Sequence, residues 1–299
     1  AAFGTRYATA QIEGYLPDNL DQEMDILGAG GTVGVVRSMH SQFLEIGPTK
    51  LKLLGLARGS DGKIINTKDI ENYRIQSFSP NRANPGVVVL SVGSSMDSGK
   101  TTSAAYLVHG LKNAGKKVAF IKLTGTIFTK DADLAFDMGA DVSADFGDFG
   151  FPSTYMYSEK ELLDLFESLL EAVRPEKPDY VIMEIADGLF QRETKMLLNH
   201  PEFMTRVDGI MFSAGDSLSA VHGVELLNQW GLFPKCISGL FTASPLLIEE
   251  VKANINVPVY TIQELALGTT AIEIFERKSR LTSTVNRKGV LNPMVAAAK

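Results

Sequence analysis

The chain has 299 residues, of which 44% are hydrophobic and 21% are charged, the usual mixture of a globular protein. Its net charge of −6 argues against nucleic acid as the main partner, because contact with a phosphate backbone needs a basic face. The single cysteine excludes a disulfide within the chain and a zinc site built from cysteines. No apolar run approaches the roughly 18–20 residues that span a membrane, and the N-terminus lacks a signal-peptide pattern, so we expect a cytoplasmic protein without membrane contact.

Residues 1–85 are predicted to form a small β-rich domain. Short apolar runs at 31–38, 43–47, 50–59 and 63–67 are separated by Gly, Pro and Asp turns. Ser60-Asp61-Gly62 is a hairpin signal between the last two runs. We expect about four to six strands here. The segment SPNRANPG that follows, residues 79–86, has the composition of a linker.

The pattern changes at Val87, where a run of apolar and β-branched residues predicts a strand buried on both faces. From there strands alternate with helices as far as residue 276. Strands are expected at 87–91, 118–122, 180–185, 209–213, 237–241 and 257–261, and helices at 100–114, 159–173, about 217–230 and 244–254. This alternation predicts an α/β domain over 86–276, with a parallel sheet between two layers of helices. Residues 277–299 are basic and poorly patterned, and they are interpreted as a C-terminal tail.

The stretch GSSMDSGKTT between the first strand and the first helix of this domain is close to a phosphate-binding loop. The standard pattern has Gly where this chain has Ser94, and its own glycine stands one place earlier, at Gly93. Backbone N–H groups of such a loop and the dipole of the helix that follows attract phosphate. The residues expected to contact a nucleotide are Gly93, Ser94, Ser95, Met96, Asp97, Ser98, Gly99, Lys100, Thr101 and Thr102. The alternative is a strand–turn–helix junction with a chance Gly-Lys-Thr.

The chemistry of the loop assigns two roles. Lys100 is expected to reach the β and γ phosphates as a catalytic cation, and the Thr101 hydroxyl is expected to bind Mg²⁺. ATP with Mg²⁺ is therefore the predicted cofactor pair.

The loop resembles that of dethiobiotin synthetase, which also has a hydroxyl residue in place of the first Gly. Two further stretches resemble that family: KLTGT at 122–126 and DYVIMEIADGL at 179–189. The order of elements matches over about 87–262. The resemblance implies a P-loop NTPase domain of the branch that includes the MinD-type ATPases. The extra lysine of those ATPases is missing, because Ser95 stands in its place.

The resemblance also implies roles for two residues at strand ends. Glu184 would bind Mg²⁺ together with Thr101, and Lys122 would act as a second catalytic cation on the transferring phosphate or hold a substrate carboxylate. The alternative for each is a solvated charge at the end of a strand. The resemblance gives no role to Asp187. The family's adenine-binding Asn has no counterpart in GLFTAS at 239–244, which leaves the choice between ATP and GTP open.

An acidic stretch at 129–150 holds six aspartates. Asp133 and Asp137 lie four residues apart, so a helix would place them on one face, as a second metal site or a site for a substrate amine. A solvated acidic loop is the favoured interpretation. Arg192 and Lys195 are weaker candidates for an anionic substrate.

The function predicted from these patterns is an ATP-dependent enzyme, ligase-like or kinase-like, that activates a small carboxylate-bearing substrate by phosphoryl transfer with Mg²⁺. The first alternative is a nucleotide-dependent switch or assembly ATPase that acts on a protein partner through the N-terminal domain. The second alternative is a regulatory module that binds a substrate and has kept the phosphate loop but lost its catalytic activity. A homodimer or higher homo-oligomer is expected.

Overall fold

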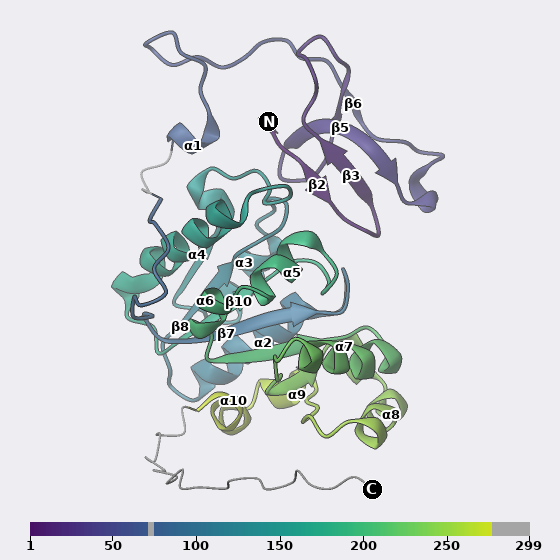
Figure 1. Ribbon diagram of the computed structural model, residues 1–299, viewed down its shortest axis with the longest axis vertical. Helices are drawn as coiled ribbons and strands as arrows, with labels where there is room; N and C mark the ends of the chain where they lie inside the picture. Colours follow the sequence, from purple (N-terminus) through teal and green to yellow (C-terminus); the bar gives the residue numbers. More distant parts are fainter. Residues whose placement is uncertain (71–74, 277–299) are drawn as a thin grey trace, which may run out of the picture.

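The first of two β-sheets is built from the N-terminal residues (Figure 1). The computed structural model describes residues 1–70 and 75–276. The strands of this sheet are β1 (Ala2–Phe3), β2 (Arg6–Tyr7), β3 (Ile12–Tyr15), β4 (Met24–Ile26), β5 (Thr32–Met39) and β6 (Lys50–Leu51). Their order is β2-β3-β5-β4-β6, with β1 paired to β5 in parallel and the other pairs antiparallel. The predicted β-rich segment is confirmed.

Three of the strands predicted for this segment are wrong or shorter than expected. The run at 43–47 follows the short helix η1 (Ser41–Phe43) and forms no strand. The run at 50–59 pairs only at Lys50–Leu51, and the run at 63–67 makes a single bridge, Ile64 with Arg58, before helix α1 (Thr67–Ile70). The apolar side chains of these runs, such as Ile46 and Leu54, are exposed, so no buried face holds the backbone in a sheet.

The second sheet is fully parallel and has the order β12-β11-β7-β10-β8-β9. Its strands are β7 (Val87–Gly93), β8 (Val118–Lys122), β9 (Val142–Asp145), β10 (Tyr180–Glu184), β11 (Gly209–Ser213) and β12 (Cys236–Ser238). Every residue of β10 and β11 is buried, as expected for strands covered on both faces.

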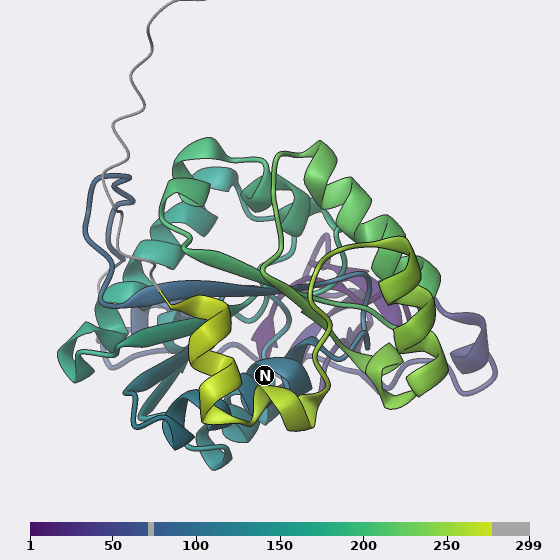
Figure 2. The ribbon, with the colours of Figure 1, turned by 90° about the horizontal axis from the view of Figure 1, so that it is seen from below.

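Helices cover both faces of this sheet (Figure 2). One layer consists of α2 (Lys100–Asn113), α3 (Lys130–Asp137), α9 (Ile262–Leu265) and α10 (Gly268–Phe275). The other consists of α4 (Glu159–Val173), α5 (Arg192–Leu198), α6 (Pro201–Thr205), α7 (Ser217–Gln229) and α8 (Pro245–Asn254). Three 3₁₀ helices, η2 (Phe146–Phe149), η3 (Arg174–Glu176) and η4 (Leu240–Ala243), complete the described elements of this part. The chain therefore has the predicted fold: a three-layer α/β domain of the P-loop NTPase type, preceded by a small β-rich sheet.

Three strands of the second sheet differ between the prediction and the structure. The edge strand β9 is missed by the pattern, because its sequence VSAD is short and half polar. The predicted strand at 237–241 ends at Ser238, since Gly239 has a φ of 113° and turns the chain into η4. The predicted strand at 257–261 forms only a bridge between Val259 and Ile237.

Residues 79–86, the predicted linker, are bound to the α/β part rather than free. A buried ion pair between Arg206 and Glu167, 3% and 0% exposed, lies beneath them, with 2.9 Å between Arg206 Nη1 and Glu167 Oε2. Arg206 also donates to the Ser79 carbonyl at 2.5 Å and to Asn84 Oδ1 at 2.8 Å. A domain boundary between residues 85 and 86 stays a prediction, and the predicted tail at 277–299 lies outside the described residues.

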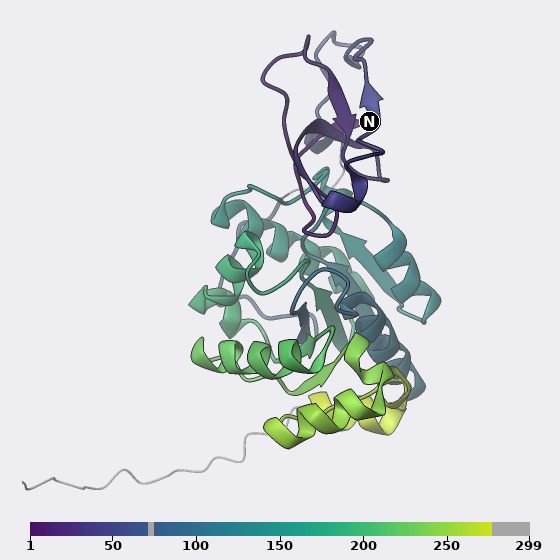
Figure 3. The ribbon, with the colours of Figure 1, turned by 90° about the vertical axis from the view of Figure 1, so that its right-hand side faces the viewer.

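The N-terminal sheet lies over the carboxyl edge of the parallel sheet (Figures 1 and 3). Its hydrogen bonds reach the segment 152–155, and Gly28 and Gly30 lie close to Thr126 and Ile127. Thr5 Oγ1 donates to the Tyr155 carbonyl at 2.7 Å, and the hydroxyls of Tyr15 and Tyr155 lie 3.0 Å apart. Thr32 Oγ1 donates to the Pro152 carbonyl at 3.1 Å. Ligands of α/β sheets bind at the carboxyl edge, so the N-terminal sheet covers the side of the molecule where a site is expected.

None of the helices in the described residues is long and apolar enough to cross a membrane.

Candidate functional site

The predicted nucleotide-binding residues run from Gly93 at the end of β7, through the loop at 94–99, to the first residues of α2, Lys100–Thr102. Gly99 precedes α2 with a φ of 91°, a backbone conformation that glycine adopts at little cost. The loop is tied to two neighbouring strand ends, because Ser94 N donates to the Ser213 carbonyl at 2.9 Å and Leu240 N donates to the Ser98 carbonyl at 3.1 Å. Its backbone shape is therefore fixed by the fold around it.

Lys100 lies beneath this loop and is 6% exposed. Its ammonium donates to the Ser95 carbonyl at 2.6 Å and to Ser98 Oγ at 3.4 Å. Burial lowers the pKa of Lys100, while the carboxylates of Glu184 and Asp187 act in the opposite direction. A buried cation inside a loop of this shape is suited to an anionic ligand.

Glu184, at the end of β10, connects the loop to the strand beside it and is 1% exposed. The Thr101 hydroxyl donates to Glu184 Oε1 at 3.1 Å, which brings the two predicted magnesium ligands together. Glu184 Oε2 is buried and makes no hydrogen bond to any described residue. A hydroxyl and a carboxylate with one free oxygen are ligands that Mg²⁺ prefers, so these residues fit that ion.

Lys122, predicted to act on a transferring phosphate, is held by two carboxylates instead. Its ammonium contacts Glu184 and lies 2.5 Å from Asp131 Oδ2. Burial alone would lower the pKa of Lys122, but these two carboxylates raise it overall. Lys122 is therefore charged, and much of its charge is balanced before any substrate binds.

Asp131 is the one residue of the acidic stretch that joins this cluster. Asp133 and Asp137 are exposed on α3 and do not form a shared site, while Asp141 pairs with Lys112 at 2.7 Å. Asp145 and Asp148 form the cap of η2. Within residues 1–70 and 75–276 no group of three or more His, Cys, Asp or Glu side chains could hold a metal. Several of these aspartates are solvated, as the favoured interpretation expects, but the stretch forms α3, β9 and η2 rather than a loop.

No hydrogen bond or ion pair between described residues joins Arg192 or Lys195 to the loop at 93–102, to Glu184 or to Lys122. Arg192 Nη1 donates to the Tyr157 carbonyl at 2.9 Å and contacts Glu193, and Lys195 is exposed on α5.

A narrow crevice between the two sheets begins next to Glu184. It is lined by Tyr7 of β2 and by residues of three segments of the α/β part, among them Thr124, Thr126, Thr154 and Asp187. Burial raises the pKa of Asp187, although Lys100, Lys122 and Arg6 act to lower it. No hydrogen bond or ion pair joins the Asp187 carboxylate to another described residue. The resemblance implies no role for Asp187, but its position in the crevice makes it a candidate.

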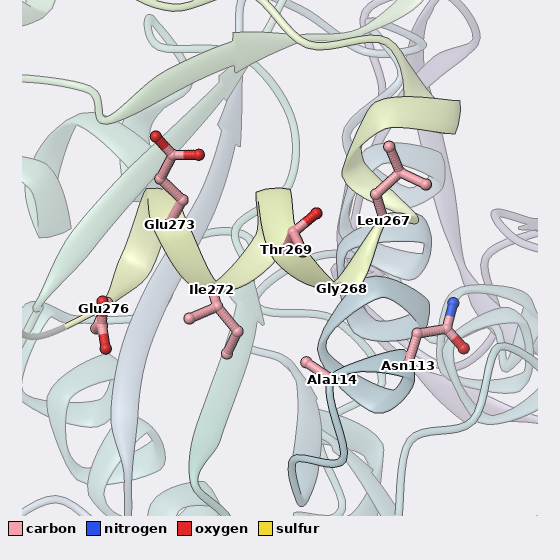
Figure 4. Close-up of a pocket in the computed structure, with 8 residues that line it drawn as sticks. All are labelled: Asn113, Ala114, Leu267, Gly268, Thr269, Ile272, Glu273 and Glu276. Carbon is pink, nitrogen blue, oxygen red and sulfur yellow. The ribbon is translucent and has the colours of Figure 1, made fainter.

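Among the other pockets of the described residues, two lie at the ends of α2. One flanks the start of α2 and is lined by Gly99, Thr102, Leu240, Thr242 and Gln263. It touches the loop and has room for part of a nucleotide. The other lies between the end of α2 and α10, lined by Asn113, Ala114, Leu267, Gly268, Thr269, Ile272, Glu273 and Glu276 (Figure 4). It is about 20 Å from the loop along the axis of α2 and carries two carboxylates, so it does not serve phosphate.

Comparisons with known proteins identify no family. No protein-family model and no curated protein matches the chain. Among solved structures, the signal recognition particle receptor FtsY from Elizabethkingia anophelis matches at 15% identity and a TM-score of 0.39, over 70% of this chain and 69% of that one.

The same receptor in complex with GDP matches at 12% identity and a TM-score of 0.40, over 71% and 70% of the two chains. FtsY from Mycoplasma mycoides matches at 12% identity and a TM-score of 0.39, over 70% of this chain and 73% of that one. Scores this low transfer neither nucleotide nor partner nor reaction to this chain. None of these structures is a dethiobiotin synthetase, so the finer resemblance gains no support. The P-loop NTPase fold rests on the topology and loop described above.

Gly188 offers a direct test of how closely the loop is packed. A Cβ placed there would lie 2.5 Å from the Ser94 carbonyl oxygen and 2.9 Å from Ser95 Cα. We expect Gly188→Ala to displace the loop and weaken nucleotide binding about tenfold or more, because the loop amides would no longer converge on phosphate. The matched control is Gly215→Ala, whose Cβ meets nothing within 4 Å. Equal nucleotide affinity of the two variants by calorimetry would show that the loop does not depend on this contact.

Proposed function

We propose that this chain binds a nucleoside triphosphate with Mg²⁺ in the loop at 93–102, hydrolyses the γ-phosphate, and transmits its nucleotide state to the N-terminal sheet. One observation carries this proposal. Five buried side-chain atoms lack a hydrogen-bond partner in the described residues, and three of them surround the loop: Ser94 Oγ, Glu184 Oε2 and Ser213 Oγ. Buried polar atoms are almost always satisfied, so a cluster of exceptions at one place favours a polar ligand there.

The phosphate and metal roles fall on separate residues. Lys100 and the loop amides would hold the β and γ phosphates, and Thr101 with Glu184 would hold Mg²⁺. When bound, the metal would offset the charge on the phosphate oxygens. The pocket lined by Thr102, Leu240 and Gln263 is where we place the base. ATP and GTP are both candidates.

A chain of hydrogen bonds links this site to the N-terminal sheet. The segment after Glu184 places Ala186 N 2.9 Å from Thr124 Oγ1, which accepts its hydrogen bond. The next residue, Gly125, donates to Thr154 Oγ1 at 2.9 Å. Tyr155 then contacts the N-terminal sheet through Thr5 and Tyr15. A movement of Glu184 toward Mg²⁺ would therefore act on the segments that hold the N-terminal sheet, which favours a nucleotide-dependent switch.

The segments that follow β5 and β6 carry exposed apolar side chains, including Leu44, Ile46 and Leu54. This supports a protein partner on the N-terminal part of the chain as the output of the switch. Homo-oligomerisation and a cytoplasmic location stay predictions.

Phosphoryl transfer to a small acceptor, as in a kinase or ligase, is the second candidate. The placement of Lys122 beside Glu184, at the edge where substrates bind, favours it. A carboxylate-bearing acceptor fits poorly, because Lys122 already pairs with two carboxylates and Asp187 adds a third negative charge to the crevice. An acceptor with a hydroxyl or amine group fits better.

Hydrogen–deuterium exchange with and without MgATP or MgGTP tests the switch. We expect nucleotide to change exchange in the loop and also in residues 2–7 and 152–155, which contact across the two sheets. A change confined to the loop would contradict transmission to the N-terminal sheet. Turnover that requires a small molecule, with exchange in residues 2–7 unchanged, would favour the transferase.

A further inference from the structure

We propose that Asp187 and Tyr7 hold the water molecule that attacks the γ-phosphate, so that the N-terminal sheet supplies part of the hydrolytic site. This inference rests on the proposed function, because it assigns the nucleophile of that same reaction. It makes hydrolysis depend on the docking of one sheet onto the other.

Asp187 lies between the loop and the crevice. Its neighbour Gly188 packs so closely against Ser94 and Ser95 that a Cβ would overlap them. Asp187 follows the end of β10 at Glu184 and precedes Gly188, and the charges of Lys100 and Lys122 act to lower its pKa. Its other side lines the crevice. We therefore place this carboxylate between the expected phosphate and the crevice.

Tyr7 approaches the same space from β2 of the N-terminal sheet. Its ring packs on Tyr155, with 5.2 Å between ring centroids. Tyr7 and Asp187 line the same crevice, and both burial and the charge of Asp187 raise the pKa of Tyr7. The residues that the structure describes offer no hydrogen bond to the Tyr7 hydroxyl. It is therefore available to a bound water.

The crevice has the size and lining that a single water needs. Its free space for water centres is about 10 Å³, enough for about one molecule. A buried water makes about three hydrogen bonds, and Asp187 can accept, Tyr7 can donate, and the hydroxyls of Thr124, Thr126 or Thr154 can complete the set.

The chemistry balances as a hydrolysis. The water oxygen forms a bond to the γ phosphorus, and the bond from that phosphorus to the bridging oxygen breaks. The nucleoside diphosphate leaves with the electron pair, and one proton of the water passes to Asp187 and then to solvent. Tyr7 orients the water and takes no proton.

The test uses the full chain with MgATP and MgGTP, measuring phosphate release and diphosphate Kd. We expect Asp187→Asn to lower kcat by about 10²–10⁴, the range for loss of a positioned proton acceptor, while Kd changes less than about threefold. Tyr7→Phe should lower kcat about tenfold, the effect of one hydrogen bond. The control Asp133→Asn removes the same charge from an exposed position on α3 and should leave kcat unchanged.

The double variant gives the sharpest result. If both residues act on one water, Tyr7→Phe should cost less than about threefold in the Asp187→Asn background. A full tenfold loss in both backgrounds, or wild-type kcat in Asp187→Asn, overturns the inference. If Asp187→Asn does not fold, the single variant Tyr7→Phe decides the test. An unchanged kcat in Tyr7→Phe overturns the inference. These outcomes differ from failure of the proposed function, in which the wild type itself binds and hydrolyses neither nucleotide.

Discussion

Replacing Lys100 with alanine is expected to weaken MgATP and MgGTP binding by about 100-fold or more, equal to about 2.7 kcal/mol. The ammonium is buried under the loop and is the cation closest to the expected β and γ phosphates. A hydrogen bond to a charged group contributes about 1.5–3 kcal/mol, and this lysine would make more than one.

In this variant the free energy of unfolding should change much less than the free energy of nucleotide binding. Alanine removes two hydrogen bonds, but it also removes the cost of keeping an ammonium away from water. We expect the free energy of unfolding to shift by about 1 kcal/mol or less. The control is Lys117→Ala, an exposed lysine at the opposite edge of the sheet. Calorimetry that finds the same nucleotide Kd for Lys100→Ala and Lys117→Ala would contradict the assignment of the loop.

Replacing Lys122 with methionine is expected to lower the free energy of unfolding by about 3–5 kcal/mol, the cost of leaving a buried charge without its partner. Glu184 is 1% exposed, and its ammonium partner is Lys122. Methionine keeps the length of the side chain, so the loss reports on charge rather than on a cavity. Turnover should fall as well, because Glu184 is a proposed magnesium ligand.

The double variant Lys122→Met with Glu184→Gln separates charge from packing. Neutralising both groups should restore most of the stability lost in the single variant, while turnover stays low. Denaturant unfolding measures the first effect and phosphate release the second. Lys130→Met, on exposed α3, serves as the control. A single variant as stable as the wild type would mean that Glu184 does not depend on Lys122.

The parts of the fold that local sequence determines were predicted well. The buried strands around Val87 and Tyr180 and the helix that begins at Lys100 follow from runs and periods within a few residues. Strand β9 was missed, because its few residues are held by pairing with β8 rather than by their own pattern. The runs around Ile46 and Leu54 were overpredicted, since nothing covers their apolar side chains.

The candidate site also has one part that local sequence predicts and one part that depends on contacts between distant residues. The loop is one continuous stretch, so its residues could be named from the sequence. The pairing of Lys122 with Asp131 joins residues on different elements, and the meeting of Tyr7 with Asp187 spans 180 positions of the chain. The first contact forms when α3 packs beside β8, and the second forms only once the two sheets dock. The local signals of that second part are the KLTGT stretch at 122–126 and Asp187, which stands next to a glycine after a buried strand.

The most direct test of the central claim is calorimetric titration of the wild-type chain with MgATP and with MgGTP, each repeated after Mg²⁺ is removed by a chelator. The account predicts that at least one nucleotide binds with a Kd below about 1 mM, and that the loss of Mg²⁺ weakens binding about tenfold or more, since Thr101 and Glu184 would lose the ion that joins them to the phosphates. No measurable binding of either nucleotide at millimolar concentration would contradict it.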